Sequence, residues 1–266
     1  MFVNVGPLFL FTLILILLGF SQVPSIILSK PGNGLNVMVT SSKEAYILGE
    51  LINLNLDIVN NSSSDIRLKG TDVNSGYLKI FIASSDQKFK GYSNSTWGLE
   101  NNKEMVIKAG ESIKSQVKIL WNFSPVNRFS NLEGFEKSHI MTDYAFPKAG
   151  AYFIRATLFI PGEKTIKIES APIQILVREP AGEDLVVWNK VKGNGDFAYF
   201  IQQDDIRIPF YKTDERAKFQ ADIEQILNDH PNSFYAVPLR QSLDKYHASE
   251  AKRQEFLQKM QKQKPQ

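Results

Sequence analysis

Hydrophobic and polar residues alternate along several stretches in the first two thirds of the chain. Between Ile52 and Ile58 every second residue is isoleucine or leucine, and asparagine or aspartate lies between them. This pattern is typical of a strand with one buried and one solvated face. The same alternation covers residues 113–121, 152–160 and 173–177, and shorter candidate strands cover 35–40, 66–68, 77–83 and 105–107. Turn residues separate these stretches, which predicts a mainly β protein with an antiparallel two-sheet sandwich over residues 35–178.

After residues 179–182, Glu-Pro-Ala-Gly, the hydrophobic spacing changes from two residues to three or four. This period predicts short helices with one apolar face each. The expected buried positions are Leu185, Trp188 and Val191, then Phe219, Ile223, Ile226 and Leu227, and finally Leu239, Leu243 and Tyr246. We therefore expect a small α-helical C-terminal region at 179–248, followed by a basic polar tail at 249–266.

The first 29 residues contain no charged side chain, and residues 7–20 form a dense apolar run of 14 residues. A run of this length fits the central region of a signal peptide, whereas a membrane-spanning helix needs about 20 residues. The small residues Gly19 and Ser21 fit a cleavage before Gln22, which gives a signal peptide at 1–21 and a linker at 22–34. Further apolar residues at 23–28 leave an uncleaved anchor open. The chain is expected to be extracytoplasmic: periplasmic, cell-surface or secreted.

Several segments resemble known families. Residues 46–50, Tyr-Ile-Leu-Gly-Glu, resemble the second-strand entry of bacterial surface and macroglobulin-like immunoglobulin-fold domains. Residues 149–156, Ala-Gly-Ala-Tyr-Phe-Ile-Arg-Ala, resemble the penultimate strand of these domains, and residues 170–177 resemble the last. The resemblance covers about residues 35–180 and implies an immunoglobulin-like β-sandwich in which Tyr152 forms a tyrosine corner, with a buried ring and a hydroxyl bonded to the backbone. Residues 226–236 resemble the turn between helices in tetratricopeptide-like repeats. That turn occurs once, so we expect a helical appendage and no repeat array.

Charge and composition limit the kinds of partner and of catalytic or metal site that we expect. The net charge is +3, and residues 240–266 contain seven Lys or Arg against three Asp or Glu. This excess lies on a polar tail and not on a folded domain, so no nucleic-acid partner is expected. There is no cysteine, which excludes disulfides, thiolate metal sites and a cysteine nucleophile. The three histidines, His139, His230 and His247, lack metal-ligand spacing, and no Gly-x-Ser-x-Gly or phosphate-binding loop is present. We expect no cofactor, no metal site and no catalytic residue.

A long segment with little regular pattern, residues 122–147, is rich in large side chains. It is either a contact loop with aromatic anchors or a loop that packs its own aromatics on an open sheet edge. The turn before the last helix offers the same two alternatives, docking a partner or packing on the sandwich. The candidate partner-binding residues are Phe129, Phe135, His139, Met141 and Tyr144 in the loop, and Phe234 and Tyr235 in the turn.

The predicted function follows from these features. We expect an exported, non-catalytic binding or assembly module of the cell envelope, which contacts another envelope protein or a glycan through the 122–147 loop, the C-terminal helices or both. The membrane would be contacted only through an uncleaved N-terminal segment. The alternative is an envelope hydrolase acting on polysaccharide or peptide, whose carboxylates converge only in the fold.

Overall fold

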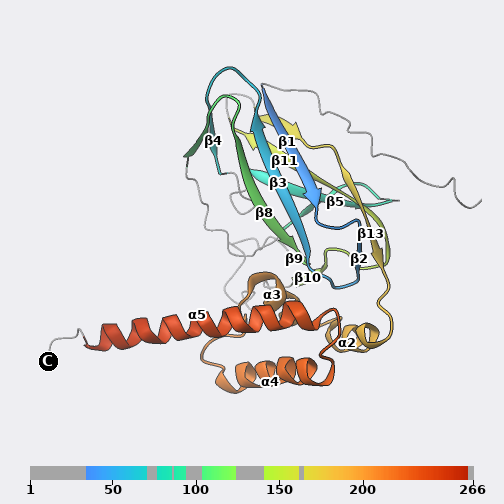
Figure 1. The fold of residues 1–266 in the computed structure, drawn as a ribbon, viewed down its shortest axis with the longest axis vertical. Helices are drawn as coiled ribbons and strands as arrows, with labels where there is room; N and C mark the ends of the chain where they lie inside the picture. The colour runs from blue at the N-terminus through green and yellow to red at the C-terminus, as the bar shows by residue number, and fades with distance from the viewer. Residues whose placement is uncertain are drawn as a thin grey trace, which may run out of the picture.

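A computed structural model describes residues 34–70, 77–85, 87–93, 104–123, 141–161 and 165–262. The predicted signal peptide at 1–21 and all but the last residue of the linker at 22–34 lie outside these residues. Figure 1 shows strands in the first part of the chain and helices in the second, packed against one end of the sheets. Helices account for nearly as much of the described chain as strands do, so "mainly β" understates the helical share.

The first large sheet has three antiparallel strands in the order β1 (Leu35–Ser41), β3 (Ile52–Asn60) and β8 (Ser112–Ile119). In β3 the isoleucines and leucines are buried, whereas Asn53 and Asn55 are exposed. The alternation in the sequence therefore predicted the buried face of this strand correctly. The register places Leu56 beside Val39 of β1 and Ser115 of β8.

The second large sheet has the order β2 (Ala45–Ile47), β13 (Ile173–Arg178), β11 (Gly150–Ile160), β5 (Leu78–Ser84) and β6 (Lys90–Tyr92), and β12 (Ile166–Glu169) also pairs with β11. Strand β2 runs parallel to β13, and the other pairs are antiparallel. Two small pairs complete the strands: β4 (Ile66–Lys69) with β7 (Glu104–Ile107), and β9 (Trp121–Phe123) with β10 (Met141–Tyr144).

The two large sheets face each other across a common core (Figure 1). Leu54 of β3 and Ile154 of β11 are completely buried there. Tyr152 lies at the edge of this core, where its buried ring packs on Phe146 and its hydroxyl donates to the carbonyl of Lys148 at 2.8 Å. The predicted burial of this ring and the predicted backbone bond of its hydroxyl are both confirmed.

Four helices follow the last strand: α2 (Glu183–Val191), α3 (Gly195–Gln203), α4 (Thr213–Asp229) and α5 (Ala236–Lys262). The predicted apolar positions of α4 and α5 are buried. In α2 the prediction was wrong for Leu185, which is exposed, while its neighbour Val187 is buried beside Trp188. None of the helices in the described part of the chain is long and apolar enough to cross a membrane.

Candidate functional site

The helical region joins the sheets through a cluster of aromatic rings around Trp188 of α2. The ring of Tyr144, from β10, meets the Trp188 ring edge-on at 4.9 Å, and the Tyr235 ring stacks on its other side at 6.3 Å. Tyr144 also meets Trp121 of β9 edge-on at 4.8 Å. Such ring pairs stabilise a fold by more than the burial of their apolar area alone provides. The cluster therefore fixes α2 and the start of α5 on the β9–β10 pair.

Buried hydrogen bonds cross the same interface. The side-chain oxygen of Gln202, in α3, accepts the backbone N–H groups of Leu120 at 3.0 Å and Trp121 at 2.6 Å. These two residues lie where the chain leaves β8 for β9, and the Gln202 side chain satisfies donors that would otherwise be buried without a partner. The Tyr235 hydroxyl donates to the carbonyl of Leu48, and the Tyr144 hydroxyl donates to that of Val191 at 3.3 Å. The strands and the helices thus share one interior.

This interface corrects the predicted role of two candidate residues. Tyr144 and Tyr235 are both buried, and burial raises the pKa of both hydroxyls. A partner bound to the folded surface does not reach either ring. Of the two alternatives, docking a partner and packing on the protein itself, both tyrosines follow the second. Met141 begins β10, but its side chain lies outside the described residues, as do Phe129, Phe135 and His139 altogether. The ends of the 122–147 segment are not irregular, because they form the β9–β10 pair.

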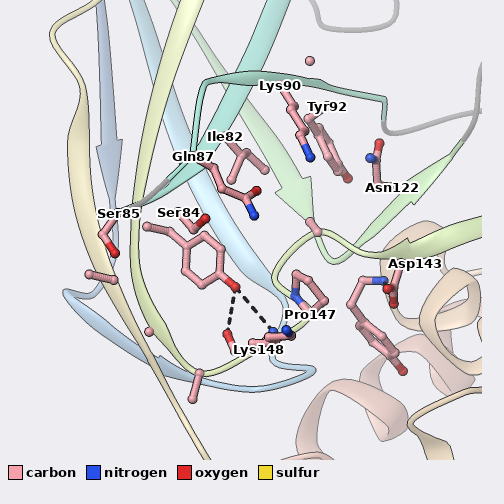
Figure 2. Close-up of a pocket in the computed structure, with 17 residues that line it drawn as sticks. Ile82, Ser84, Ser85, Gln87, Lys90, Tyr92, Asn122, Asp143, Pro147 and Lys148 are labelled. Atoms are coloured by element: carbon pink, nitrogen blue, oxygen red, sulfur yellow. Dashed lines mark hydrogen bonds between the residues drawn. The ribbon is translucent and has the colours of Figure 1, made fainter.

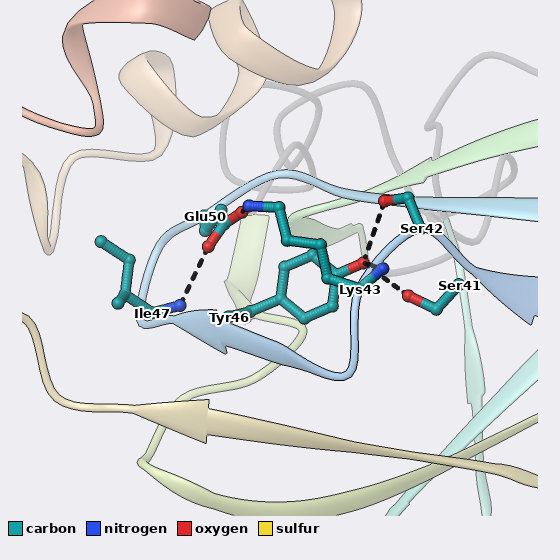
Figure 3. A network of polar contacts seen from close by, with 6 residues as sticks. All are labelled: Ser41, Ser42, Lys43, Tyr46, Ile47 and Glu50. Carbon is teal, nitrogen blue, oxygen red and sulfur yellow. Dashed lines mark hydrogen bonds and ion pairs between the residues drawn. The ribbon is translucent and has the colours of Figure 1, made fainter.

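Phe234 is the remaining candidate, and its ring is 45% exposed. Figure 3 shows the polar network around β2, and Phe234 contacts this network at Lys43. Glu50 accepts the N–H of Ile47 at 3.0 Å and pairs with the ammonium group of Lys43. That ammonium group also lies 4.4 Å from the centre of the Phe234 ring, a cation–π distance. Phe234 is therefore accessible, but one face of its ring already contacts the protein.

A cavity of about 630 Å³ opens beside the two ends of the 122–147 segment (Figure 2). Strands β5 and β6 line one side of it, and the turn between β10 and β11 lines the other. Its polar side chains include Gln87, Lys90, Asn122 and Asp143. Among the described lining residues Asp143 is the one carboxylate, whereas glycoside hydrolysis normally uses two. This cavity can hold a polar ligand, and the lining residues that the structure describes do not supply two carboxylates.

A smaller cavity, of about 350 Å³, lies between the solvated face of the first sheet and the start of α5. Asp204, which ends α3 in a left-handed conformation, is its central charge. The carboxylate accepts hydrogen bonds from Lys118 of β8 at 2.7 Å, Ser242 at 2.9 Å and Lys245 at 3.1 Å. Asp204 therefore ties β8 to α5 and is fully engaged within the protein.

The Asp204 site predicts a pH effect on stability. Burial by itself raises the pKa of this carboxyl, but hydrogen bonds from Lys118, Lys245 and Ser242 outweigh it, and the pKa lies below its ordinary value. A lowered pKa contributes stability that is complete at pH 7 and is lost as the pH falls below about 4. We expect Asp204→Asn, which tolerates the same backbone conformation, to unfold at lower urea concentration than the wild type at pH 7, and this difference to become smaller at pH 3. A difference that stays constant between the two pH values would contradict this assignment.

The most exposed large apolar side chains lie on the helical region. Phe210 and Tyr211, in the α3–α4 loop, are 69% and 67% exposed, and Phe256 of α5 is 61% exposed. Arg253 lies 6.0 Å from the centre of the Phe210 ring, which joins the loop to α5. We call this set the basic apolar surface; its members are Phe210, Tyr211, Arg253, Phe256, Leu257 and Met260. Contiguous apolar surface of this kind marks contact sites in soluble proteins.

Sequence reasoning missed this surface, because it assigned residues 249–266 to a solvated polar tail. The signal that could have found it is the spacing of Phe256, Leu257 and Met260, which continues the apolar face of the preceding turns. Within the described ranges no three His, Cys, Asp or Glu side chains are grouped to hold a metal ion.

Comparison with known proteins adds no assignment. The sequence matches no family and no curated protein. Among solved structures it is similar to the sporulation control protein Spo0M of Bacillus subtilis (11% identity, TM-score 0.30), to the C-terminal domain of wzt (11%, 0.34) and to the β-glucosidase EmGH1 of Erythrobacter marinus (8%, 0.31). These matches cover 59%, 57% and 54% of this chain and 54%, 82% and 15% of the respective structures. At such TM-scores the likenesses support no argument about fold or function.

Proposed function

We propose that the protein is an exported, non-catalytic binding or assembly module of the cell envelope, and that its C-terminal helices carry the contact surface. The observation behind this proposal is the basic apolar surface, where Phe210 and Tyr211 of the α3–α4 loop and Phe256, Leu257 and Met260 of α5 are exposed, and where Arg253 of α5 lies over the Phe210 ring. Aromatic residues and arginine are the side chains most often found at the centre of protein contacts. The partner class expected from the sequence is another envelope protein or a glycan.

In this proposal the strands form an immunoglobulin-like β-sandwich that serves as the scaffold. Three features support it: two largely antiparallel sheets share one core, β2 pairs with the last strand, β13, and Tyr152 bonds the backbone of Lys148. The aromatic cluster and the Gln202 bonds then hold the helices on this scaffold. A rigid scaffold favours binding, because less conformational freedom is lost when the partner docks.

A hydrolase is the weaker alternative. The two cavities described above each contain one carboxylate among their lining residues, Asp143 in the larger and Asp204 in the smaller. Asp204 is already bonded to two lysines and a serine. The 122–147 loop remains a second proposed contact segment through Phe129, Phe135, His139 and Met141, whose side chains lie outside the described residues, whereas its Tyr144 is buried in the core.

Site-specific photo-cross-linking tests the proposed function. A benzophenone amino acid placed at Phe256 in the full chain should give a discrete cross-linked adduct when the native cell envelope is irradiated. The matched control places the same group at Gln225, an exposed position of α4 that lies outside the basic apolar surface. An adduct at Phe256 and none at Gln225 supports a docking surface on α5. Equal labelling at both positions, or no labelling at either, rejects it.

A further inference from the structure

The apolar face of α5 continues past the body of the protein. Tyr246 is buried against the other helices, and Arg253, Leu257 and Met260 follow it at intervals of seven, four and three residues, which keeps them in one stripe of the helix. Figure 1 shows the C-terminal part of α5 extending beyond α4 and away from the sheets. The stripe that packs the first half of α5 onto the protein therefore has no cover on its second half within the described chain.

Positive charge is concentrated in the part of the sequence that contains this stripe. Residues 252–266 contain five Lys or Arg and one Glu, a net charge of +4, whereas the whole chain has +3. Lys252 and Lys259 lie four residues before and three residues after Phe256, so they flank it on the helix surface. A second copy of the chain would bring two such segments of like charge together, which disfavours self-association and favours an anionic surface.

We propose that the basic apolar surface lies on the anionic surface of a lipid bilayer. A basic helix with a stripe of Phe, Leu and Met binds in the plane of the interface, with its apolar side chains at the acyl boundary and its lysines at the phosphates. Phe210 and Tyr211 add two exposed rings next to the same stripe. Phe256, Leu257 and Met260 form a small contact, which fits reversible binding that assists a second membrane attachment. This inference rests on the proposed contact surface on α5, and it replaces the protein or glycan expected from the sequence by the lipid surface of the envelope, although the sequence predicted membrane contact only through the N-terminal segment.

The absence of cysteine allows a direct test on the full chain, since one introduced cysteine is the only labelling site. Phe256→Cys carries an environment-sensitive NBD label in place of the phenyl ring. The control, Gln258→Cys, carries the same label two residues away, on a part of the helix turned away from the stripe. Both proteins keep the same N-terminal apolar run, so any attachment through that run affects both equally.

The probe is a vesicle of phosphatidylcholine with about 30% phosphatidylglycerol and a nitroxide-labelled lipid, compared with vesicles that lack the anionic lipid. We expect quenching and a blue shift of the label at position 256, little change at position 258, and loss of the effect in about 0.5 M salt, where charges are strongly screened. Lys252→Gln and Lys259→Gln should each weaken the effect by about fivefold. Equal quenching at both positions, or quenching that ignores anionic lipid and salt, overturns the proposal.

The cross-linking experiment separates this proposal from the proposed function. A protein adduct from position 256 together with no vesicle effect would keep a binding module and replace the bilayer by a protein partner. A lipid adduct together with the vesicle effect supports both. Failure of both measurements would reject the surface altogether.

Discussion

Gln202→Met is expected to lower the free energy of unfolding by about 3 kcal/mol, because it leaves the buried N–H groups of Leu120 and Trp121 without an acceptor. Methionine has nearly the same length and favours helices, so the shape of the side chain and the stability of α3 are largely kept. The variant therefore removes the acceptor for these two N–H groups, together with the hydrogen bond between the Gln202 side chain and the Tyr92 hydroxyl. Urea unfolding followed by circular dichroism measures the change.

The control is Gln225→Met on α4, where the side chain is exposed and a change within about 0.5 kcal/mol is expected. The shape of the unfolding curve matters as much as its midpoint. If strands and helices share one interior, Gln202→Met should shift a single transition for both the far-ultraviolet and the tryptophan signals. A variant in which the helices unfold separately, while the strands keep their wild-type midpoint, would show that Gln202 joins two independent units.

The long elements could be predicted from the sequence because their burial is periodic. In β3 and β11 one face is apolar over seven or more residues, and in α4 the positions of Phe219, Ile223 and Ile226 repeat over two turns. Among the strands of three or four residues, β4 and β7 were predicted, whereas β2, β6, β9, β10 and β12 were not. Their positions depend on pairing with strands distant in the sequence, which local pattern does not encode.

The candidate site was harder to predict, because an aromatic side chain reads the same in a sequence whether it faces the core or a partner. Tyr235 and Phe234 are neighbours in one turn, yet one is completely buried under Leu48 and the other is half exposed over Lys43. What separates them is the position of α2, which no local pattern determines. At Phe256 the error was the opposite one: an exposed apolar residue was assigned to a polar tail, because the sequence around it is rich in Gln and Lys.

Substitution of Gly49 is expected to give the second large loss of stability, and this loss measures how closely α2 approaches the sheets. Its φ is +74°, and a Cβ added to it would lie 2.3 Å from Cζ3 of Trp188, a separation that atoms do not tolerate. Gly110 has nearly the same conformation, φ +78°, with nothing within 4 Å of the added atom. We therefore expect Gly110→Ala to lower the free energy of unfolding by about 1 kcal/mol through backbone strain alone, and Gly49→Ala by about 3 kcal/mol through strain plus overpacking.

The part of the stability loss by which Gly49→Ala exceeds Gly110→Ala should depend on the indole ring of Trp188. In a Trp188→Leu background, which is itself destabilised, Gly49→Ala should cause about the same further loss as Gly110→Ala, because the colliding ring atoms are gone. Urea unfolding of the four proteins of this cycle gives the coupling between the two positions, expected at about 2 kcal/mol. If the losses in the free energy of unfolding are simply additive, the Trp188 ring does not pack against residue 49. The helices would then lack the fixed attachment that the proposed contact surface on α5 requires.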